Sequence, residues 1–251
     1  KKLYVYADFD WLKEVEFIGE LGYESLRGSD SYSFSFHDEW LRKHGDLFLC
    51  EDLNNINAVH TEVLSVGEKF HTLLSRRFDR STEGRRIHFA SAMTLLGLSD
   101  GDNVTTGHGY LNIVDFILQN CTNVEDNLQE LYRRVVFNVC IGNSDDHFRN
   151  HGFLLTPKGW TLSPAYDMNP TLNEYQSLLI TSTSNKADLQ TLLDACEEYM
   201  IGRNVAEIII QEVTDAVQDW RSQALRLGIS KREMDVFASV LDSRLKPNRS
   251  L

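Results

Sequence analysis

Two stretches of this 251-residue chain decide its fold: Gly142–Asn150, with the sequence GNSDDHFRN, and Ala165–Asp167, with the sequence AYD. Asp145 carries a carboxylate that can accept a proton from a hydroxyl group. Asn150 and Asp167 carry the neutral and anionic oxygens that Mg²⁺ prefers when it also holds phosphate oxygens. A base followed along the chain by two such metal ligands predicts a centre for phosphoryl transfer.

These residue types also have a purely structural explanation. Clusters of Asp and Asn mark turns and helix caps, and the spacing of Asp145 and Asn150 alone arises often by chance. Here the pair follows an apolar helical pattern, and a short hairpin pattern separates it from Asp167. Protein kinases place their base and metal ligands in the same order. The order of the elements therefore favours kinase chemistry over a set of turns.

The residues around these positions resemble the HipA-like kinases, which are the toxin halves of bacterial toxin–antitoxin pairs. Residues 136–153 resemble the catalytic segment of that family, and residues 160–170 resemble its metal-binding segment. Residues 77–80, with the sequence RFDR, resemble the hinge where the main chain meets adenine, and residues 86–92 resemble the helix that follows. Two further matches, to the family's small N-terminal subdomain, lie at residues 17–21 and 34–41.

This resemblance implies an α+β, two-lobed fold like that of protein kinases, with a small β-rich N-terminal part and a mainly α-helical C-terminal lobe. It places an N-terminal subdomain at residues 1–50 and a remnant of the kinase small lobe, ending in the hinge, at residues 51–79. The helical catalytic lobe would then span residues 80–251.

The resemblance also implies a serine/threonine protein kinase that uses ATP and Mg²⁺. Asp145 would be the base, and Asn150 and Asp167 would be the metal ligands. The nucleoside would contact the main chain of the hinge and one of its side chains, at Arg77, Phe78 and Asp79.

Neighbouring residues of the site have competing explanations. His147 can orient the catalytic loop or touch a phosphate, and a purely structural role is equally open. Arg149 stands where the family commonly has Lys, and a cation beside the transferred phosphate favours the charge that develops there. For Asp146 we favour a loop or cap carboxylate. For the basic cluster beside the hinge we favour a solvated face or an ion pair with Asp79.

One requirement of a kinase is missing between the first predicted strand and the hinge. A kinase needs a Lys on a small-lobe strand to hold the nucleotide phosphates, and usually a loop over them. The lysines in this region are Lys13, Lys43 and Lys69, and none has a suitable place. Either the sequence closes up across a break near Cys50–Ala58, or the chain is a natural remnant that lost nucleotide binding. We favour the break, because losing most of a small lobe would expose apolar surface.

The composition agrees with an intracellular enzyme. A formal net charge of −12 argues against DNA binding, except through a basic partner. No apolar run is long enough to suggest a membrane span, and the start of the sequence lacks the apolar region of a signal peptide, so we expect a cytoplasmic protein. The four cysteines lie far apart in neither a zinc nor a disulfide pattern, which predicts free thiols.

Hydrophobic periodicity predicts the secondary structure. Strands are expected near residues 3–6 and 32–36, followed by a short helix that Asp38 caps. A hairpin is expected over residues 63–78. Helices are expected over 87–96, 109–120 and 124–141, and two more begin at the capping boxes Asn204–Glu207 and Ser230–Glu233.

In biological terms, the family resemblance implies a toxin that stops growth by phosphorylating a translation component such as an aminoacyl-tRNA synthetase. A small helix-turn-helix antitoxin of the HipB-like kind would hold it in check and supply any contact with DNA. Two other functions remain open: a non-catalytic module that keeps the kinase-like helical lobe to dock a partner, and a small-molecule kinase with the same site chemistry. Nucleotide binding separates the module from the kinases.

Overall fold

A computed structural model describes residues 2–7, 14–26, 29–36, 57–66, 70–81, 85–171 and 173–244. The chain has mixed α and β structure and forms two compact units. One unit comprises Lys1–Glu51 with His60–Arg76, and the other comprises Asp52–Val59 with Arg77–Leu251. All the predicted catalytic and metal-binding residues, and the hinge from Arg77 onward, belong to the second unit.

The first unit holds two antiparallel sheets. Its three-stranded sheet has the order β1-β2-β3, formed by Lys2–Ala7, Glu16–Leu26 and Ser29–Phe36. Its two-stranded sheet is a hairpin of β4 (Thr61–Val66) and β5 (Phe70–Ser75). The predicted strands near residues 3–6 and 32–36 and the predicted hairpin are therefore confirmed. The short helix expected after Asp38 lies outside the described residues.

The second unit is mainly helical and carries one small antiparallel sheet, of order β6-β7-β8. Its strands are β6 (Phe89–Ser91), β7 (Gly152–Thr156) and β8 (Gly159–Leu162). Its α-helices are α2 (Ala92–Leu95), α3 (Tyr110–Asn120), α4 (Val124–Ile141), α5 (Leu189–Asp194), α6 (Arg203–Gln218), α7 (Trp220–Arg226) and α8 (Lys231–Arg244). Two 3-10 helices, η2 (Val104–Thr106) and η3 (Cys196–Tyr199), complete the described elements.

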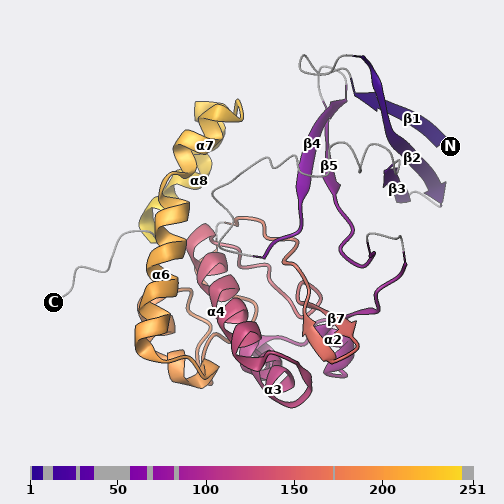
Figure 1. The fold of residues 1–251 in the computed structure, drawn as a ribbon. Coiled ribbons are helices and arrows are strands. Elements are labelled where there is room, and N and C mark those ends of the chain that lie inside the picture. The colour runs from indigo at the N-terminus through magenta and orange to yellow at the C-terminus, as the bar shows by residue number, and fades with distance from the viewer. Residues whose placement is uncertain are drawn as a thin grey trace. The chain divides into compact units, whose positions relative to one another are not determined.

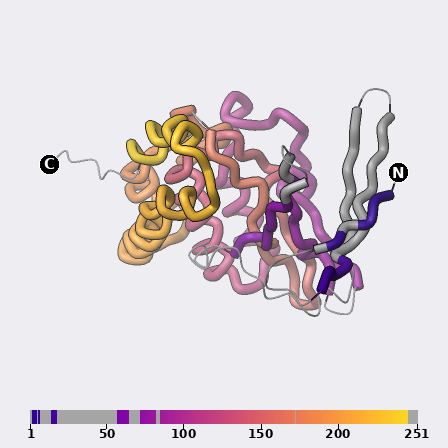
Figure 2. The backbone as a smooth tube through the Cα atoms, turned by 90° about the horizontal axis from the view of Figure 1, so that it is seen from above, coloured from indigo at the N-terminus to yellow at the C-terminus, as the bar shows by residue number. Residues whose placement is uncertain are grey.

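Helix α4 is the centre of the helical unit. It packs against α3, α5, α6 and α8, and Figure 1 shows it running beside α6. Its predicted apolar stripe, Leu128, Leu131, Val135 and Val139, is buried. Figure 2 shows α6, α7 and α8 gathered together in orange and yellow. Because each buried Leu or Val stabilises the fold by about 1.5–3 kcal/mol relative to exposure, this stripe fixes the helix that leads to Asp145.

The helix expected over residues 87–96 is wrong in its first half. Residues Phe89–Ser91 form β6, which pairs with β7 between Phe89 and Leu154. Helix α2 begins only after Ser91, whose side chain accepts a hydrogen bond from the Thr94 N–H. The partner strand lies more than fifty residues away in the sequence, so a long-range pairing overrides the local helical pattern.

The two predicted capping boxes have different outcomes. At α8 the Ser230 hydroxyl accepts from the Glu233 N–H at 3.3 Å, and the Glu233 carboxylate accepts from the Ser230 N–H at 3.0 Å, so this capping box is confirmed. Helix α6 instead begins at Arg203, with Gly202 as an N-cap that makes no side-chain hydrogen bond. The expected cap at Asn204 is therefore wrong, because the Gly202 carbonyl already accepts the first helical hydrogen bond, from Ala206.

The cysteines that the structure describes are free thiols. Cys121, Cys140 and Cys196 form no disulfide, as expected, and Cys50 lies outside the described residues. Burial raises the pKa of the Cys140 thiol to about 12, so this group stays protonated at neutral pH.

Within the described part of the chain, no helix combines the length and the apolar character that crossing a membrane requires.

Gly142 makes the turn between α4 and the predicted catalytic loop. It adopts a left-handed conformation with φ +74°, and its carbonyl accepts hydrogen bonds from the main chain and the hydroxyl of Thr171 at 2.9 and 2.7 Å. A Cβ atom at this position would lie 2.6 Å from Cγ1 of Val240 in α8. The sharp turn therefore needs glycine both for its backbone conformation and for the close packing of α8.

We predict that Gly142→Ala lowers the free energy of unfolding by about 2–4 kcal/mol, because left-handed strain and the clash with Val240 add. Gly107→Ala is the matched control, since Gly107 has a similar φ of +80° and its Cβ would meet nothing within 4 Å. The control should lose about 1 kcal/mol from backbone strain alone. Urea unfolding of both variants measures the difference, and equal losses would contradict the close approach of α8.

Candidate active site

Hydrogen bonds from main-chain groups and from hydroxyl groups hold the segment that leads into Asp145. The Asn143 N–H donates to the Asn138 carbonyl of α4 at 2.9 Å. The Ser144 carbonyl accepts from both the N–H and the hydroxyl of Ser177, at 3.1 and 2.8 Å. The hydroxyls of Ser144 and Thr171 lie 2.5 Å apart. The residues after the metal-binding segment therefore hold the start of the catalytic loop.

Asp145, the predicted base, presents its carboxylate to solvent. Its side chain is 75% exposed, and its Oδ1 lies 3.0 Å from Nε2 of His147. The other ring nitrogen of His147, Nδ1, is buried and has no hydrogen-bond partner among the described residues. The His147 carbonyl accepts from the Asn150 N–H at 2.9 Å. His147 thus lies between the predicted base and a predicted metal ligand, in contact with both.

Asp146 is buried, unlike its neighbour Asp145, and it is not the loop or cap carboxylate that we expected. Its Oδ2 accepts hydrogen bonds from the Tyr110 hydroxyl at 2.7 Å and the Asn138 amide at 2.8 Å, and it lies 2.8 Å from Nε2 of His151. All four side chains are buried. Burial, followed by the charge of Asp146, holds the pKa of Tyr110 well above its ordinary value. The expected loop or cap carboxylate is instead a buried anchor.

This buried anchor, formed by Tyr110, Asn138, Asp146 and His151, joins four parts of the chain. Tyr110 begins α3, Asn138 belongs to the last turn of α4, and His151 precedes β7. Hydrogen bonds to a charged group each contribute about 1.5–3 kcal/mol, more than neutral ones. The anchor therefore fixes the backbone on both sides of the catalytic loop. No sequence pattern marks it, because its members come from different elements.

The catalytic loop and the metal-binding segment meet at Tyr166. Its hydroxyl donates to the Arg149 carbonyl at 2.7 Å. Because Arg149 precedes Asn150 and Tyr166 precedes Asp167, this bond brings the segments of both predicted metal ligands side by side. Burial raises the pKa of Tyr166 to about 12, so the hydroxyl remains a donor at neutral pH. Tyr166 is a positioning residue that we did not single out from the sequence.

Asp167 has an unusual backbone conformation. It adopts φ +58°, one of three positive-φ residues other than glycine among those described. Its exposed carboxylate accepts a hydrogen bond from the Asn169 amide at 2.8 Å. Positive φ in a residue other than glycine costs about 1–3 kcal/mol and concentrates at functional sites. This strained residue directly follows Tyr166, whose hydroxyl is held by the Arg149 carbonyl.

The predicted hinge also contacts Tyr166, through aromatic rings. Phe78 stacks on Tyr166 with ring centroids 5.8 Å apart, and Phe89 of β6 lies 5.5 Å from Phe78. Asp79 does not offer a free carboxylate, because Arg77 binds both of its oxygens, at 2.7 and 2.5 Å. Arg80 adds a third contact at 2.7 Å, so the expected ion pair in this basic cluster is confirmed. The hydrogen bonds from Arg77 hold the pKa of Asp79 below its usual range.

Arg149 pairs with a carboxylate from outside the catalytic loop. Its guanidinium lies 3.0 Å from the Asp100 carboxylate, and both side chains are at least half exposed. The structure thus joins the hinge, the catalytic loop and the metal-binding segment through Tyr166, while the heads of Arg77 and Arg149 are engaged in surface ion pairs.

The donors of Asn150 and Asp167 suit a hard cation. One amide and one carboxylate provide oxygen ligands, and Mg²⁺ binds readily through one or two protein oxygens when phosphates and water complete its shell. Among the residues that the structure describes, no cluster of three or more His, Cys, Asp or Glu side chains offers an independent metal site. The donor types of Asn150 and Asp167 therefore fit a hard cation such as Mg²⁺.

Comparison with known proteins identifies one family. The model of the HipA-like C-terminal domain matches residues 47–220. The serine/threonine-protein kinase toxin HipA of Shewanella oneidensis is 28% identical over 130 residues, which are 45% of this chain and 30% of that protein. A provisionally named kinase of Sinorhizobium fredii is 32% identical over 123 residues, which are 48% of this chain and 29% of that kinase. The chain thus spans about a third of the length of these relatives.

A solved structure has the same fold. It is the complex of HipA, HipB and operator DNA from Shewanella oneidensis, and it covers 97% of this chain and 62% of the chain compared, with a TM-score of 0.64 and 16% sequence identity. At that identity the likeness concerns the fold alone.

We predict that Tyr110→Phe loosens the catalytic loop by removing one donor to the buried Asp146. The free energy of unfolding should fall by about 1.5–3 kcal/mol, because the lost bond goes to a charged group. Tyr132→Phe is the matched control, since the buried Tyr132 hydroxyl donates to the neutral Leu192 carbonyl at 2.9 Å. It should lose about 1 kcal/mol. Amide hydrogen exchange over residues 143–151 should accelerate in Tyr110→Phe only, and unchanged exchange there would contradict the anchor.

Proposed function

Because this chain belongs to the HipA-like C-terminal domain family, we propose that it is the catalytic part of an ATP-dependent serine/threonine protein kinase. One observation carries the proposal: an exposed Asp145 lies on a loop that is held at the next residue by the buried Asp146 anchor and at Arg149 by the Tyr166 hydroxyl. A structural Asp would gain nothing from being held exposed in this way. A base must be both accessible and positioned.

Each predicted site residue has a role that its contacts permit. Asp145 would accept the proton of the acceptor hydroxyl, with His147 orienting its carboxylate from 3.0 Å away. Asn150 and Asp167 would hold Mg²⁺, which when bound neutralises charge on the nucleotide phosphates. Tyr166, which precedes Asp167, supports this role through its bond to the carbonyl of Arg149, which precedes Asn150.

When a nucleotide binds, Arg149 would have to leave its partner Asp100. The Asp79 carboxylate of the hinge would likewise have to leave Arg77 and Arg80. Arg149 is half exposed in its pair with Asp100. An exposed ion pair contributes about 0–1 kcal/mol, so turning the guanidinium toward a phosphate costs little. The hinge offers its main chain and the Phe78 ring to the nucleoside, while Arg77 and Arg80 already occupy the Asp79 carboxylate.

One observation favours a second function, a kinase-like module that binds a partner without catalysis. In the described part of the chain before Arg77, Lys2 is the only lysine, and it lies in β1 of the three-stranded sheet. A kinase needs a lysine on the phosphates of its nucleotide. Nucleotide binding by the full-length gene product distinguishes the two functions.

We further propose that the protein acts as the toxin of a toxin–antitoxin pair, with a translation component such as an aminoacyl-tRNA synthetase as its substrate. The solved relative was crystallised with HipB and operator DNA. With a net charge of −12, this chain is poorly suited to bind phosphate backbone directly, so its contact with DNA would pass through a basic helix-turn-helix antitoxin. Residues 34–41 are our candidate contact for that antitoxin, and residues 37–41 lie outside the described residues.

We predict that Asp145→Ala and Asp167→Ala each abolish transfer of the ATP γ-phosphate to a protein acceptor. Loss of a general base alone lowers such rates by about 10²–10⁴-fold. Calorimetry should show weaker Mg-ATP binding for Asp167→Ala and unchanged binding for Asp145→Ala, because only the former removes a metal ligand. Asp115→Ala, on the exposed face of α3, is the control and should keep full activity.

The assay uses the full-length gene product, with radiolabelled ATP. Ordinary activity in either site variant would overturn the assignment of that residue. Absence of nucleotide binding by the unmodified protein would overturn the kinase function and favour the binding module.

A further inference from the structure

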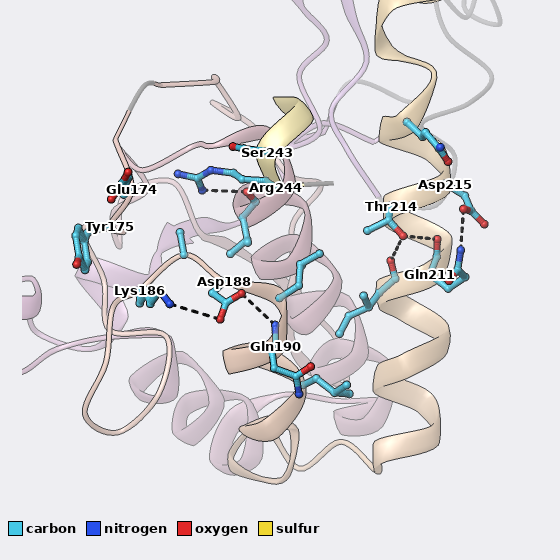
Figure 3. A pocket seen from close by; sticks show the side chains of 16 residues that line it. Glu174, Tyr175, Lys186, Asp188, Gln190, Gln211, Thr214, Asp215, Ser243 and Arg244 are labelled. Carbon is cyan, nitrogen blue, oxygen red and sulfur yellow. Dashed lines mark hydrogen bonds and ion pairs between the residues drawn. The ribbon is translucent and has the colours of Figure 1, made fainter. Parts of the chain in front are cut away.

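A cavity lies in the helical unit, and the residues predicted to be catalytic do not line it. It has a volume of about 590 Å³, within the range of about 300–1,000 Å³ typical of ligand sites. Its walls are the loop at Glu174–Tyr175, the turn and helix start at residues 186–190, helix α6, and the end of α8 (Figure 3). None of Asp145, Asn150 and Asp167 lines it.

The cavity is apolar inside and charged at its rim. Its apolar lining consists of Val139, Ala187, Leu189, Leu193 and Ile210. Glu174 and Asp215 lie at opposite sides of it, as Figure 3 shows. A ligand that fits must therefore bring apolar atoms to the centre and polar or charged groups to the edge.

The two cations at the rim already have partners. The Arg244 guanidinium donates to the main-chain carbonyls of Val139, at 3.0 Å, and of Asn173. Lys186 lies 3.9 Å from the Asp188 carboxylate, which also caps α5 by accepting from Gln190 and Thr191. The charge of Lys186 is therefore paired with a carboxylate, whereas the Arg244 guanidinium keeps its charge because its hydrogen bonds go to neutral carbonyls.

The carboxylates at the rim outnumber these cations. Glu174 is exposed, and its carboxylate interacts electrostatically with the Arg244 guanidinium. Asp215 is exposed and accepts one hydrogen bond, from the neutral Gln211 amide at 2.8 Å. Three carboxylates line the cavity against two cations, so its charge is negative on balance, which suits a ligand with basic groups flanking an apolar one.

We propose that this cavity docks a basic, partly apolar segment of the protein that the kinase phosphorylates. Lys or Arg side chains of that segment would reach Glu174 and Asp215, and an apolar side chain would cover the lining at Leu193 and Ile210. This inference rests on the proposed function and names the chemistry of its substrate.

The link to the active site is the segment that bears Glu174 and Tyr175. Two residues further on, Ser177 donates its N–H and hydroxyl to the carbonyl of Ser144, which precedes Asp145. A polypeptide bound against Glu174 therefore lies on the segment that supports the catalytic loop. That connection favours the acceptor protein over an unrelated ligand.

The test measures docking without nucleotide or catalysis. The probe is a short fluorescent peptide that alternates arginine with leucine, and its negative counterpart carries glutamate in place of arginine. Fluorescence anisotropy on the full-length gene product should show binding of the basic peptide only. The double variant Glu174→Gln, Asp215→Asn should bind it about five- to tenfold more weakly, since two partly exposed charge pairs are lost.

Two matched variants separate the cavity from general charge attraction. Asp115→Asn with Asp235→Asn changes the net charge equally on exposed faces of α3 and α8 outside the cavity lining, and should weaken binding less than twofold. Thr214→Arg places a long cationic side chain on the α6 wall of the cavity and should abolish binding while keeping the helix, because Arg favours helices more than Thr.

Equal binding by the unmodified protein and the cavity double variant would overturn the proposal, as would equal weakening by both double variants. Sedimentation that shows self-association abolished by Thr214→Arg, without peptide binding, would assign the cavity to a second copy of the chain and also overturn it. A protein that binds the peptide at this cavity but transfers no phosphate would refute the proposed kinase function and leave the docking site standing.

Discussion

The structure of the site depends on one buried carboxylate. Oδ2 of Asp146 lies within hydrogen-bond distance of Tyr110, Asn138 and His151, and all four side chains are buried from bulk solvent. A buried carboxylate without partners would cost several kcal/mol, so the three donors and the acceptor require one another. The start of α3, the end of α4 and the approach to β7 cannot separate without breaking this group. The backbone of Asp145, one residue away, is therefore fixed, while its side chain remains open to solvent.

The second constraint is Tyr166, which connects segments that are distant in sequence. Its ring lies against Phe78 and Phe89, and its hydroxyl binds the Arg149 carbonyl. The predicted hinge, catalytic loop and metal-binding segment therefore share one side chain. This connection agrees with the proposed phosphotransfer function, because catalysis in that class is mainly positioning and charge stabilisation.

Local patterns predicted the elements that local interactions determine. The apolar stripe of α4, the β4–β5 hairpin and the Ser230 capping box all follow from residues close in sequence, and the structure has each of them. The order of Asp145, Asn150 and Asp167 likewise pointed to the family. Sequence reasoning failed where distant residues decide: Phe89–Ser91 became a strand because β7 pairs with it, and Asp146 became an anchor because Tyr110 reaches it from α3. The cavity beside α6 had no local signal either, since its lining comes from five separate segments.

The most direct test of this account is the single-turnover rate of phosphoryl transfer in Asp146→Asn, measured beside Mg-ATP affinity and circular dichroism on the full-length gene product. An amide nitrogen in place of one carboxylate oxygen disturbs the anchor without touching the nucleotide or the acceptor. Displacement of reacting groups by about 1 Å costs on the order of 10²-fold in rate. The account predicts a folded protein with Mg-ATP affinity within about twofold of normal and transfer slowed by at least that factor. An unchanged transfer rate, or a loss of rate matched by an equal loss of Mg-ATP affinity, would contradict the claim that Asp146 positions Asp145.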